Sequence, residues 1–291
     1  MINVIRVLLG VFTAFFGFSY FKDIAKAKSE NNFEDVSAGK AVATGFVTDF
    51  FDTLGIGSFA PTVAMFNALK MNISDRLIPG TLNVCHTIPV VLEAFIFTTV
   101  IKVDPVTLIC LIGAAVVGSY LGAGVIAKMD ERKIQIIMGI ALAITALLML
   151  LAQLGLMPGG GTATGLSGAK LVIGIIGNFI LGALMTAGVG LYSPCMAMVY
   201  FLGMSPDVAF PIMMGSCAML MPVASTKFIK EGAYAKKTSF FITIGGVVGV
   251  FIAAFIVKSM PIDILKWVVI VVITYTSISM LRKAFKSERA E

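Results

Sequence analysis

The chain has 291 residues, of which 58% are hydrophobic and only 13% are charged. Soluble domains carry about 25% charged residues, and a mean hydropathy of +0.98 is too high for one water-soluble core. The sequence therefore predicts an all-α polytopic membrane protein. In such a protein the net charge of +6 reflects lysines and arginines in loops, so we expect no nucleic-acid partner.

The cysteines and the histidine point to neither a disulfide nor a metal framework. Four cysteines lie inside apolar segments and form no CxxC pair: Cys85, Cys110, Cys195 and Cys217. His86 is the only histidine, which excludes His-rich sites such as HExxH. We expect no metal and no cofactor.

The first expected element is the apolar stretch 1–21. Its run of about 20 residues exceeds the roughly 7–15 residues of a signal-peptide core, and no convincing cleavage site follows it. We therefore interpret it as an N-terminal transmembrane helix rather than a signal peptide. A polar linker of mixed charge is expected over 22–37.

The first repeat is expected over 38–155. It opens with an apolar stretch, 41–69, that contains a glycine-rich break. A second span, 73–101, is interrupted by Pro79-Gly80 and by Pro89. Two regular spans are expected after it, at 105–127 and 133–154.

A glycine-rich connector, 156–168, separates the first repeat from the second repeat at 169–285. The second repeat follows the same plan, and a short tail, 286–291, ends the chain. The expected segments are 170–202 with its own break, 206–228 with Pro211 and Pro222, 238–257 and 262–280.

The two breaks share one motif, T-x-G-x-G-x-x-x-P. It reads TLGIGSFAP at 53–61 and TAGVGLYSP at 186–194, and the copies lie 133 residues apart. Met65 matches Met198 at the same spacing, which supports an internal duplication. Breaks at matching places in two halves of a hydrophobic chain are the best sequence pointer to a transporter's substrate site.

The distribution of positive charge favours inverted repeats. If both motif segments cross the membrane, 14 Lys and Arg residues lie on the side of the C-terminus and 8 on the other side. If both segments enter and return, the split becomes 17 against 5. The positive-inside rule favours the re-entrant form, and both forms place the C-terminus in the cytoplasm and the N-terminus outside a cytoplasmic (inner) membrane.

The broken backbone predicts an anion site. Unsatisfied N–H and C=O groups are tolerated at membrane depth only inside protein or beside a wet cavity. The helices that restart near Ser58 and Leu191 would each present a positive N-terminus. The candidate substrate-binding residues are the motif positions Thr53, Gly55, Gly57, Ser58, Pro61, Thr186, Gly188, Gly190, Tyr192, Ser193 and Pro194, and four residues after proline breaks, Thr81, Asn83, Ser216 and Cys217. The alternative is that the glycines only allow close helix packing.

Ionisable residues in the apolar segments predict proton coupling. Asp49 and Asp52 are three residues apart and share one helix face, as do His86 and Glu93, which are seven apart. Each charged residue near the bilayer centre costs at least about 2.5–3.5 kcal/mol, so a functional role is the default hypothesis. The alternative is that these side chains only hydrogen-bond neighbouring helices.

The duplicated motif resembles that of the TauE/SafE transporters of bacteria and archaea, over about 38–284. In that family each half opens with a glycine-rich segment that ends in proline, often as G-x-G-G-G. Here the two segments are GIGSFAP at 55–61 and GVGLYSP at 188–194, with fewer glycines. The resemblance implies transport of a small sulfur-containing anion such as sulfite, a sulfonate or thiosulfate.

A secondary anion transporter is not the only function that fits these patterns. The same site would serve an anion channel or a transporter of another small organic anion. An intramembrane enzyme is disfavoured because Asp49 and Asp52 share one helix and no serine has a plausible histidine base, so we expect no enzyme. The expected partners are a small anion and the bilayer. The direction of transport, the coupling ion and assembly into a homo-oligomer stay open.

Overall fold

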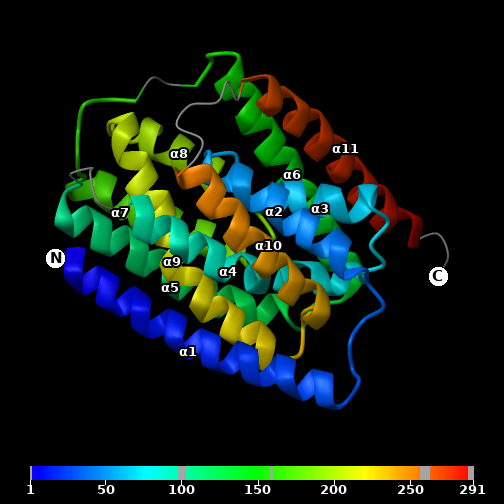
Figure 1. The fold of residues 1–291 in the computed structure, drawn as a ribbon. Coiled ribbons are helices and arrows are strands. Elements are labelled where there is room, and N and C mark those ends of the chain that lie inside the picture. The colour runs from blue at the N-terminus through cyan, green and yellow to red at the C-terminus, as the bar shows by residue number, and fades with distance from the viewer. Residues whose placement is uncertain (1, 98–102, 158–159, 256–262, 288–291) are drawn as a thin grey trace.

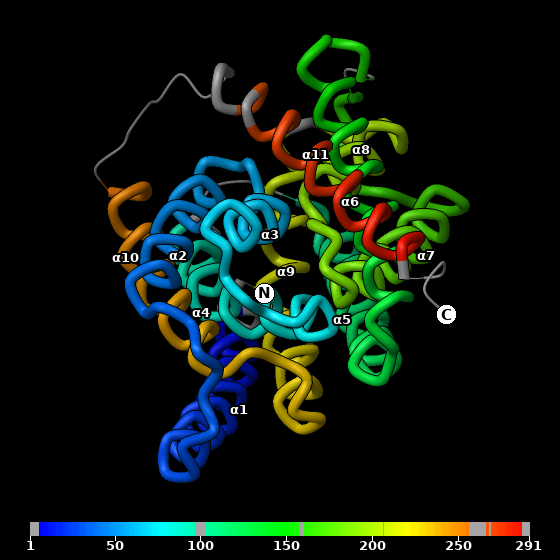
Figure 2. The backbone as a smooth tube through the Cα atoms, turned by 90° about the vertical axis from the view of Figure 1, so that its right-hand side faces the viewer, coloured from blue at the N-terminus to red at the C-terminus, as the bar shows by residue number. Residues whose placement is uncertain are grey.

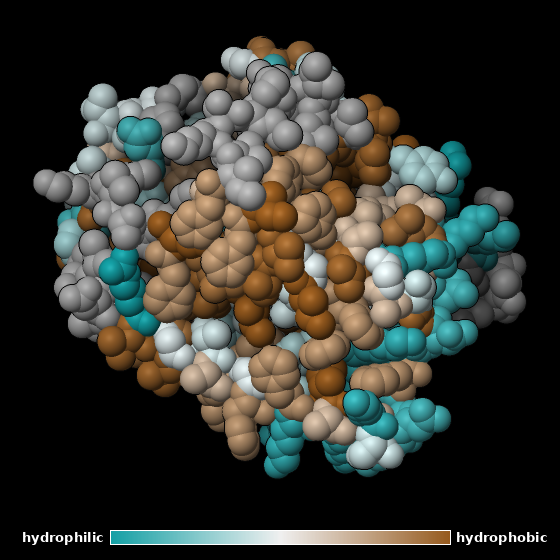
Figure 3. Space-filling model, in the orientation of Figure 1, coloured by the Kyte–Doolittle hydropathy of each residue, from teal (hydrophilic) through white to brown (hydrophobic). Residues whose placement is uncertain are grey.

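The computed structural model describes residues 2–97, 103–157, 160–255 and 263–287. In these ranges the chain forms 11 α-helices, one 3₁₀ turn and no β-strand (Figure 1). Seven of these helices are long and apolar enough to cross a membrane, and a broad apolar face covers the bundle (Figure 3). The predicted all-α membrane class is confirmed. The predicted span ends at 98–101 and 256–262 and the last residues of the tail lie outside the described residues.

Helix α1 (Ile2–Ser29) lies along the outside of the bundle (Figures 1 and 2) and packs mainly on α9. It continues eight residues beyond the expected end at residue 21. The extension is rich in alanine and lysine, which are good helix formers, and Lys26 pairs with Glu30 one turn later. The first part of the expected linker is therefore helical.

The two halves have the same order of elements, a broken helix pair followed by three long helices. The first half contains α2 (Ala38–Thr53), α3 (Phe59–Ala68), the 3₁₀ turn η1 (Asp75–Leu77), α4 (Ile78–Phe97), α5 (Pro105–Ile126) and α6 (Glu131–Gln153). The second half contains α7 (Gly168–Met185), α8 (Tyr192–Phe201), α9 (Pro206–Lys230), α10 (Lys236–Phe255) and α11 (Asp263–Ser287).

Each broken pair forms a helical hairpin with the motif at its tip. Gly55 and Gly57 have φ of 89° and 90°, and Gly188 has φ of 92°, a conformation that glycine adopts without steric penalty. At the other end, the Lys40 ammonium donates to the Leu69 carbonyl over 2.7 Å. Lys170 does the same to Leu202 over 3.0 Å in the second half. Both motif segments therefore double back, as the re-entrant form requires.

The open ends of the two hairpins lie at opposite ends of α6. Just beyond the first hairpin, Asp75 accepts from Gln135 near the start of α6 over 2.9 Å. Just beyond the second, the Met204 carbonyl accepts from the Gly161 N–H, which follows the end of α6, over 2.9 Å. The tips therefore approach each other from opposite directions. How the hairpins sit relative to a bilayer stays a prediction.

The helices of each hairpin pack against long helices of the other half. Helix α2 packs along α10 and α7 packs along α5, while α3 contacts α11 and α8 contacts α6. A Cβ on Gly249 would meet the Phe46 carbonyl, as a Cβ on Gly118 would meet the Phe179 carbonyl. These glycines let backbones approach closely. Helices α4 and α9 are the most buried of the candidate spans and contact each other.

The predicted interruptions at Pro89 and Pro211 are wrong, whereas α4 does begin next to Pro79, at Ile78. Helix α4 runs through Pro89, and α9 runs through Pro211 and Pro222. Proline at position 89 removes the donor that would have served the Cys85 carbonyl. The Thr243 hydroxyl of α10 donates to that carbonyl over 2.8 Å, so a neighbouring helix restores the missing hydrogen bond.

Candidate functional site

The two hairpin tips meet at one small cavity of about 30 Å³. By this measure a water molecule needs about 10–15 Å³, so the cavity has room for two or three. Long helices α4, α6 and α11 close its sides through Val90, Thr145 and Ile273. The other lining residues are Asp52, Ile56, Gly57, Ser58, Phe59 and Ala60 from the first half and Met185, Gly190, Leu191, Tyr192, Ser193 and Cys217 from the second.

Helices α3 and α8 both begin at this cavity. Pro61 and Pro194 occupy the third position of these helices, where an N–H would have no partner inside the helix. Neither N-cap residue, Ser58 or Leu191, caps the first turn with its side chain. Among the described residues, the N–H groups of the first two positions in each helix find no acceptor. Two partial positive charges therefore face one small space.

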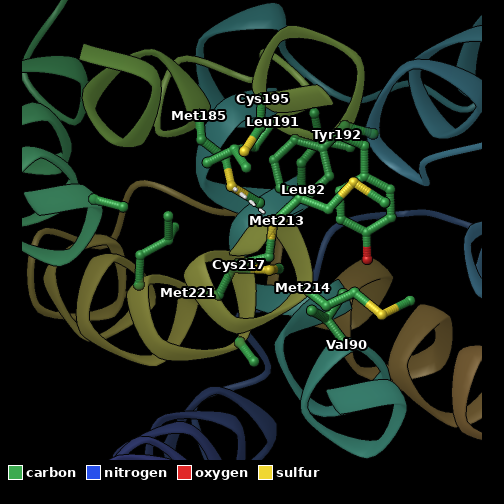
Figure 4. Packing of buried hydrophobic residues seen from close by; sticks show 14 of the residues in the cluster. Leu82, Val90, Met185, Leu191, Tyr192, Cys195, Met213, Met214, Cys217 and Met221 are labelled. Carbon is green, nitrogen blue, oxygen red and sulfur yellow. Dashed lines mark hydrogen bonds between the residues drawn. The ribbon is translucent and has the colours of Figure 1, made fainter. Parts of the chain in front are cut away.

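One side of the cavity is rich in sulfur. Cys217 of α9 lies 3.7 Å from the Met185 sulfur at the end of α7, and both line the cavity. Figure 4 shows Cys195 of α8 with Met213 and Met214 of α9 in the same buried cluster. Methionine is flexible and polarisable, so this wall can adapt its shape.

Glu93 of α4 connects the two tips. Its Oε1 accepts a hydrogen bond from the Thr53 hydroxyl over 2.7 Å, and its Oε2 accepts one from the Tyr192 hydroxyl over 3.3 Å. Glu93 is fully buried, and Thr53 and Tyr192 are nearly so. A single carboxyl group therefore joins the first motif to the second.

A second buried network joins α2, α4 and α3. His86 Nδ1 lies 2.7 Å from Asp49 Oδ1, and His86 Nε2 lies 2.9 Å from the Thr62 hydroxyl. Asp49 Oδ2 has no hydrogen-bond partner, and a Cβ on Gly246 of α10 would meet it. Thr62 was not among the residues predicted from the sequence, although it directly follows the motif proline.

Most of the predicted site residues lie at the cavity or in the networks beside it. Seven line the cavity: Asp52, Gly57, Ser58, Gly190, Tyr192, Ser193 and Cys217. Thr53, Glu93, Asp49 and His86 belong to the two networks just described. Pro61 and Pro194 lie one residue behind the lining positions, in the first turns of α3 and α8.

Five other predicted residues do not line the cavity and make structural contacts. Thr81 donates to the Leu77 carbonyl and accepts from the Ala235 N–H. Thr186 donates to the Ala183 carbonyl. Asn83 donates to Pro79 and Met185, and Ser216 accepts from Asn178. Gly188 lies against Met138 and Leu82.

A larger pocket of about 200 Å³ lies beside the cavity. Gly55 and Phe210 line it, and Lys266 near the start of α11 contributes a positive charge. Ile56 and Ser193 line both this pocket and the central cavity. These two residues, one from each motif, therefore lie between the two spaces.

Several lining residues carry no signal in the sequence. Val90, Thr145 and Ile273 are ordinary members of long apolar helices, so only the packing of the helices identifies them. Within the described residues, no group of three or more His, Cys, Asp or Glu side chains is arranged to hold a metal ion.

Comparison with known proteins assigns the family. The family model described as sulfite exporter TauE/SafE matches residues 2–149 and 170–291, which is nearly the whole chain. No curated protein and no solved structure matches the chain. The chain belongs to the sulfite exporter TauE/SafE family, a family of membrane transporters for sulfur-containing anions.

Proposed function

We propose that the chain is a secondary transporter that moves a small sulfur-containing anion, such as sulfite, a sulfonate or thiosulfate, across the cytoplasmic membrane. One observation carries the proposal. The N-termini of α3 and α8, whose N-cap residues make no side-chain cap hydrogen bond, both face one small cavity. Free N–H groups and aligned peptide dipoles at helix N-termini bind anions, and transporters use broken helices in this way.

The size of the cavity supports a moving site rather than an open pore. About 30 Å³ leaves little spare room around a multi-atom anion, so the proposed mechanism has the tips separate when the substrate enters. Ile56 and Ser193 stand between the cavity and the larger pocket. Movement of these two residues would open the site toward the larger pocket, which Lys266 also lines.

The proposed orientation places the C-terminus in the cytoplasm and the N-terminus outside. The hairpin geometry supports the re-entrant form, for which 17 of the 22 lysines and arginines lie on the cytoplasmic side. The opposite entry of the two hairpins supports inverted repeats. With this orientation the larger pocket faces outward, because α11 begins there and ends near the C-terminus.

Proton coupling follows from the acids at the site. Asp52 lines the cavity and Glu93 holds Tyr192, another lining residue. An ionised carboxylate beside a bound anion repels it strongly at low dielectric. The anion therefore binds when these groups are protonated, and proton and anion move together. The Asp49–His86 pair lies next to them and is the proposed proton store.

A liposome flux screen tests the function. The purified protein is reconstituted, and uptake of sulfite, thiosulfate, sulfate, sulfonates and small carboxylates is measured with and without a pH gradient. We expect saturable flux of a sulfur-containing anion that depends on the gradient. Flux without saturation or gradient dependence would indicate a channel. Transport of a cation with no anion flux would overturn the proposal.

A further inference from the structure

A groove of about 320 Å³ lies between α1, α5 and α9, away from the central cavity. Phe12 and Phe15 of α1 and Tyr120 of α5 supply its apolar surface. Lys227 and Lys230 in the last turn of α9 line its other part. Phe15 is 62% exposed, so the groove opens toward the surroundings of the bundle. In a membrane protein those surroundings are lipid.

The two lysines have no fixed counter-ion. Within the described residues, no carboxylate lies at ion-pair distance from either of them. The nearby acids are engaged elsewhere, because Glu231 pairs with Lys128 at 4.0 Å and Asp23 pairs with Lys236 at 3.0 Å. The Lys227 ammonium instead lies 4.7 Å from the centre of the Tyr120 ring. Two positive charges therefore remain available at the groove.

The groove is polar at one end and apolar at the other. Lys230 is the last residue of α9. In the loop that follows, Tyr234 donates to Asp23 of α1 over 2.6 Å, so Asp23 marks the level of that loop. Phe15 precedes Asp23 by eight residues, or about 12 Å along a helix. The aromatic side chains thus lie deeper along the bundle than the lysines.

We propose that this groove binds one anionic phospholipid. Its phosphate lies between Lys227 and Lys230, and an acyl chain lies along Phe12 and Phe15. Basic residues at the end of an apolar groove between membrane helices suit such headgroups, and lysine stems reach to the interface while covering apolar surface. The bound lipid would hold α1 against α5 and α9.

The test uses the full-length protein purified in a neutral detergent. Binding of phosphatidylglycerol, phosphatidylcholine and inorganic phosphate is compared by native mass spectrometry and by the shift in Tm. We expect retained phosphatidylglycerol and a larger Tm increase with it than with phosphatidylcholine, and no increase with phosphate. The double variant Lys227→Gln/Lys230→Gln should weaken phosphatidylglycerol binding about 30-fold, the factor expected for two interfacial lysines.

Two further variants test whether the lipid occupies the apolar part of the groove and whether its charge contact is local. Phe15→Ala removes acyl contact at an exposed position and should weaken binding without affecting folding. Lys28→Gln/Lys286→Gln removes two exposed charges elsewhere and should leave binding unchanged. Equal binding of the two lipids, or full preference in Lys227→Gln/Lys230→Gln, would overturn the proposal. Stabilisation by phosphate alone would assign the lysines to a free anion instead.

Discussion

The two halves of the molecule share a backbone plan but differ in chemistry. Both contain a hairpin whose tip opens a helix at the central cavity. Only the first half contains buried carboxyl and imidazole side chains there. At a spacing of 133 residues, Asp49, Asp52, His86 and Glu93 correspond to Gly182, Met185, Met219 and Thr226. The comparison separates two tasks, since both tips can hold an anion but only one half can exchange protons.

The packing around Asp49 shows how the difference is accommodated. Asp49 Oδ2 lies against Gly246 of α10. In the other half Gly182 lies against Ala115 of α5, and at a spacing of 131 residues Ala115 corresponds to Gly246. In the first hairpin the larger side chain, Asp49, is on the hairpin helix and faces a glycine. In the second hairpin the glycine is on the hairpin helix and the larger residue, Ala115, is on the long helix. A carboxylate in the first half is possible because the facing helix has no side chain at that point.

The largest expected effect comes from replacing Glu93, a buried carboxyl group that has no acidic counterpart in the second half. We expect Glu93→Gln to reduce the pH dependence of anion binding, because the amide cannot ionise, while Asp52 at the cavity keeps the remaining dependence. A unit charge about 8 Å from an anion at an effective dielectric of 20 contributes about 2 kcal/mol, or about 30-fold in Kd. Thiosulfate suits the measurement because it stays ionised across the pH range used, so a change in its affinity reports on the protein and not on the anion. In the unaltered protein its affinity should fall as pH rises.

The matched control is the corresponding residue of the second half. Thr226→Val should keep the pH dependence, because Thr226 only donates to the Pro222 carbonyl. If Glu93→Gln retained the full pH dependence of binding and the full response of flux to a pH gradient, Glu93 would have no role in coupling. Asp52→Asn, at the cavity itself, should then be measured in the same way.

A smaller effect is expected from adding a methyl group to each tip. Nothing lies within 4 Å of a Cβ at either Gly57 or Gly190, so alanine would project into free space at the cavity. Both Gly57→Ala and Gly190→Ala should lower flux. Gly57 has φ of 90°, so only Gly57→Ala should also lower stability, by about 1–2 kcal/mol.

Gly113→Ala is the control for the glycine pair. Gly113 lies on the regular helix α5 and also has free space around it, away from the cavity. Flux and Tm should therefore be unchanged or slightly improved in this variant. Normal flux in both tip variants would mean that the motif glycines serve only the turn and not the substrate.

The smallest expected effect is the coupling energy between Asp49 and Gly246, which lie against each other. Gly246→Ala should destabilise the protein by about 1–3 kcal/mol through overpacking against the carboxylate. Asp49→Gly/Gly246→Ala recreates the pair that the second half contains. Its loss of stability should be smaller than the sum of the single losses by about 1 kcal/mol or more. Additive losses in chemical denaturation would show that the two positions are not coupled.

Much of the fold followed from local patterns in the sequence. Hydropathy indicated the membrane class, and repeated glycines and prolines located both breaks, which α2–α3 and α7–α8 confirm. The prolines of α4 and α9 misled the prediction because their effect depends on neighbours. The Cys85 carbonyl, left without a donor by Pro89, is served by Thr243, which lies 158 residues away in the chain.

Tertiary packing decided which residues meet. Spacing along the chain placed His86 and Glu93 on one helix face, but only the fold paired His86 with Asp49 and Thr62 and joined Glu93 to both tips. It also brought Thr145 and Ile273 to the cavity. Periodicity and turn chemistry are properties of neighbouring residues and can be read from the sequence. Contacts across about 100 residues depend on how whole helices pack, and an isolated apolar or hydroxyl side chain carries no mark of its distant partner.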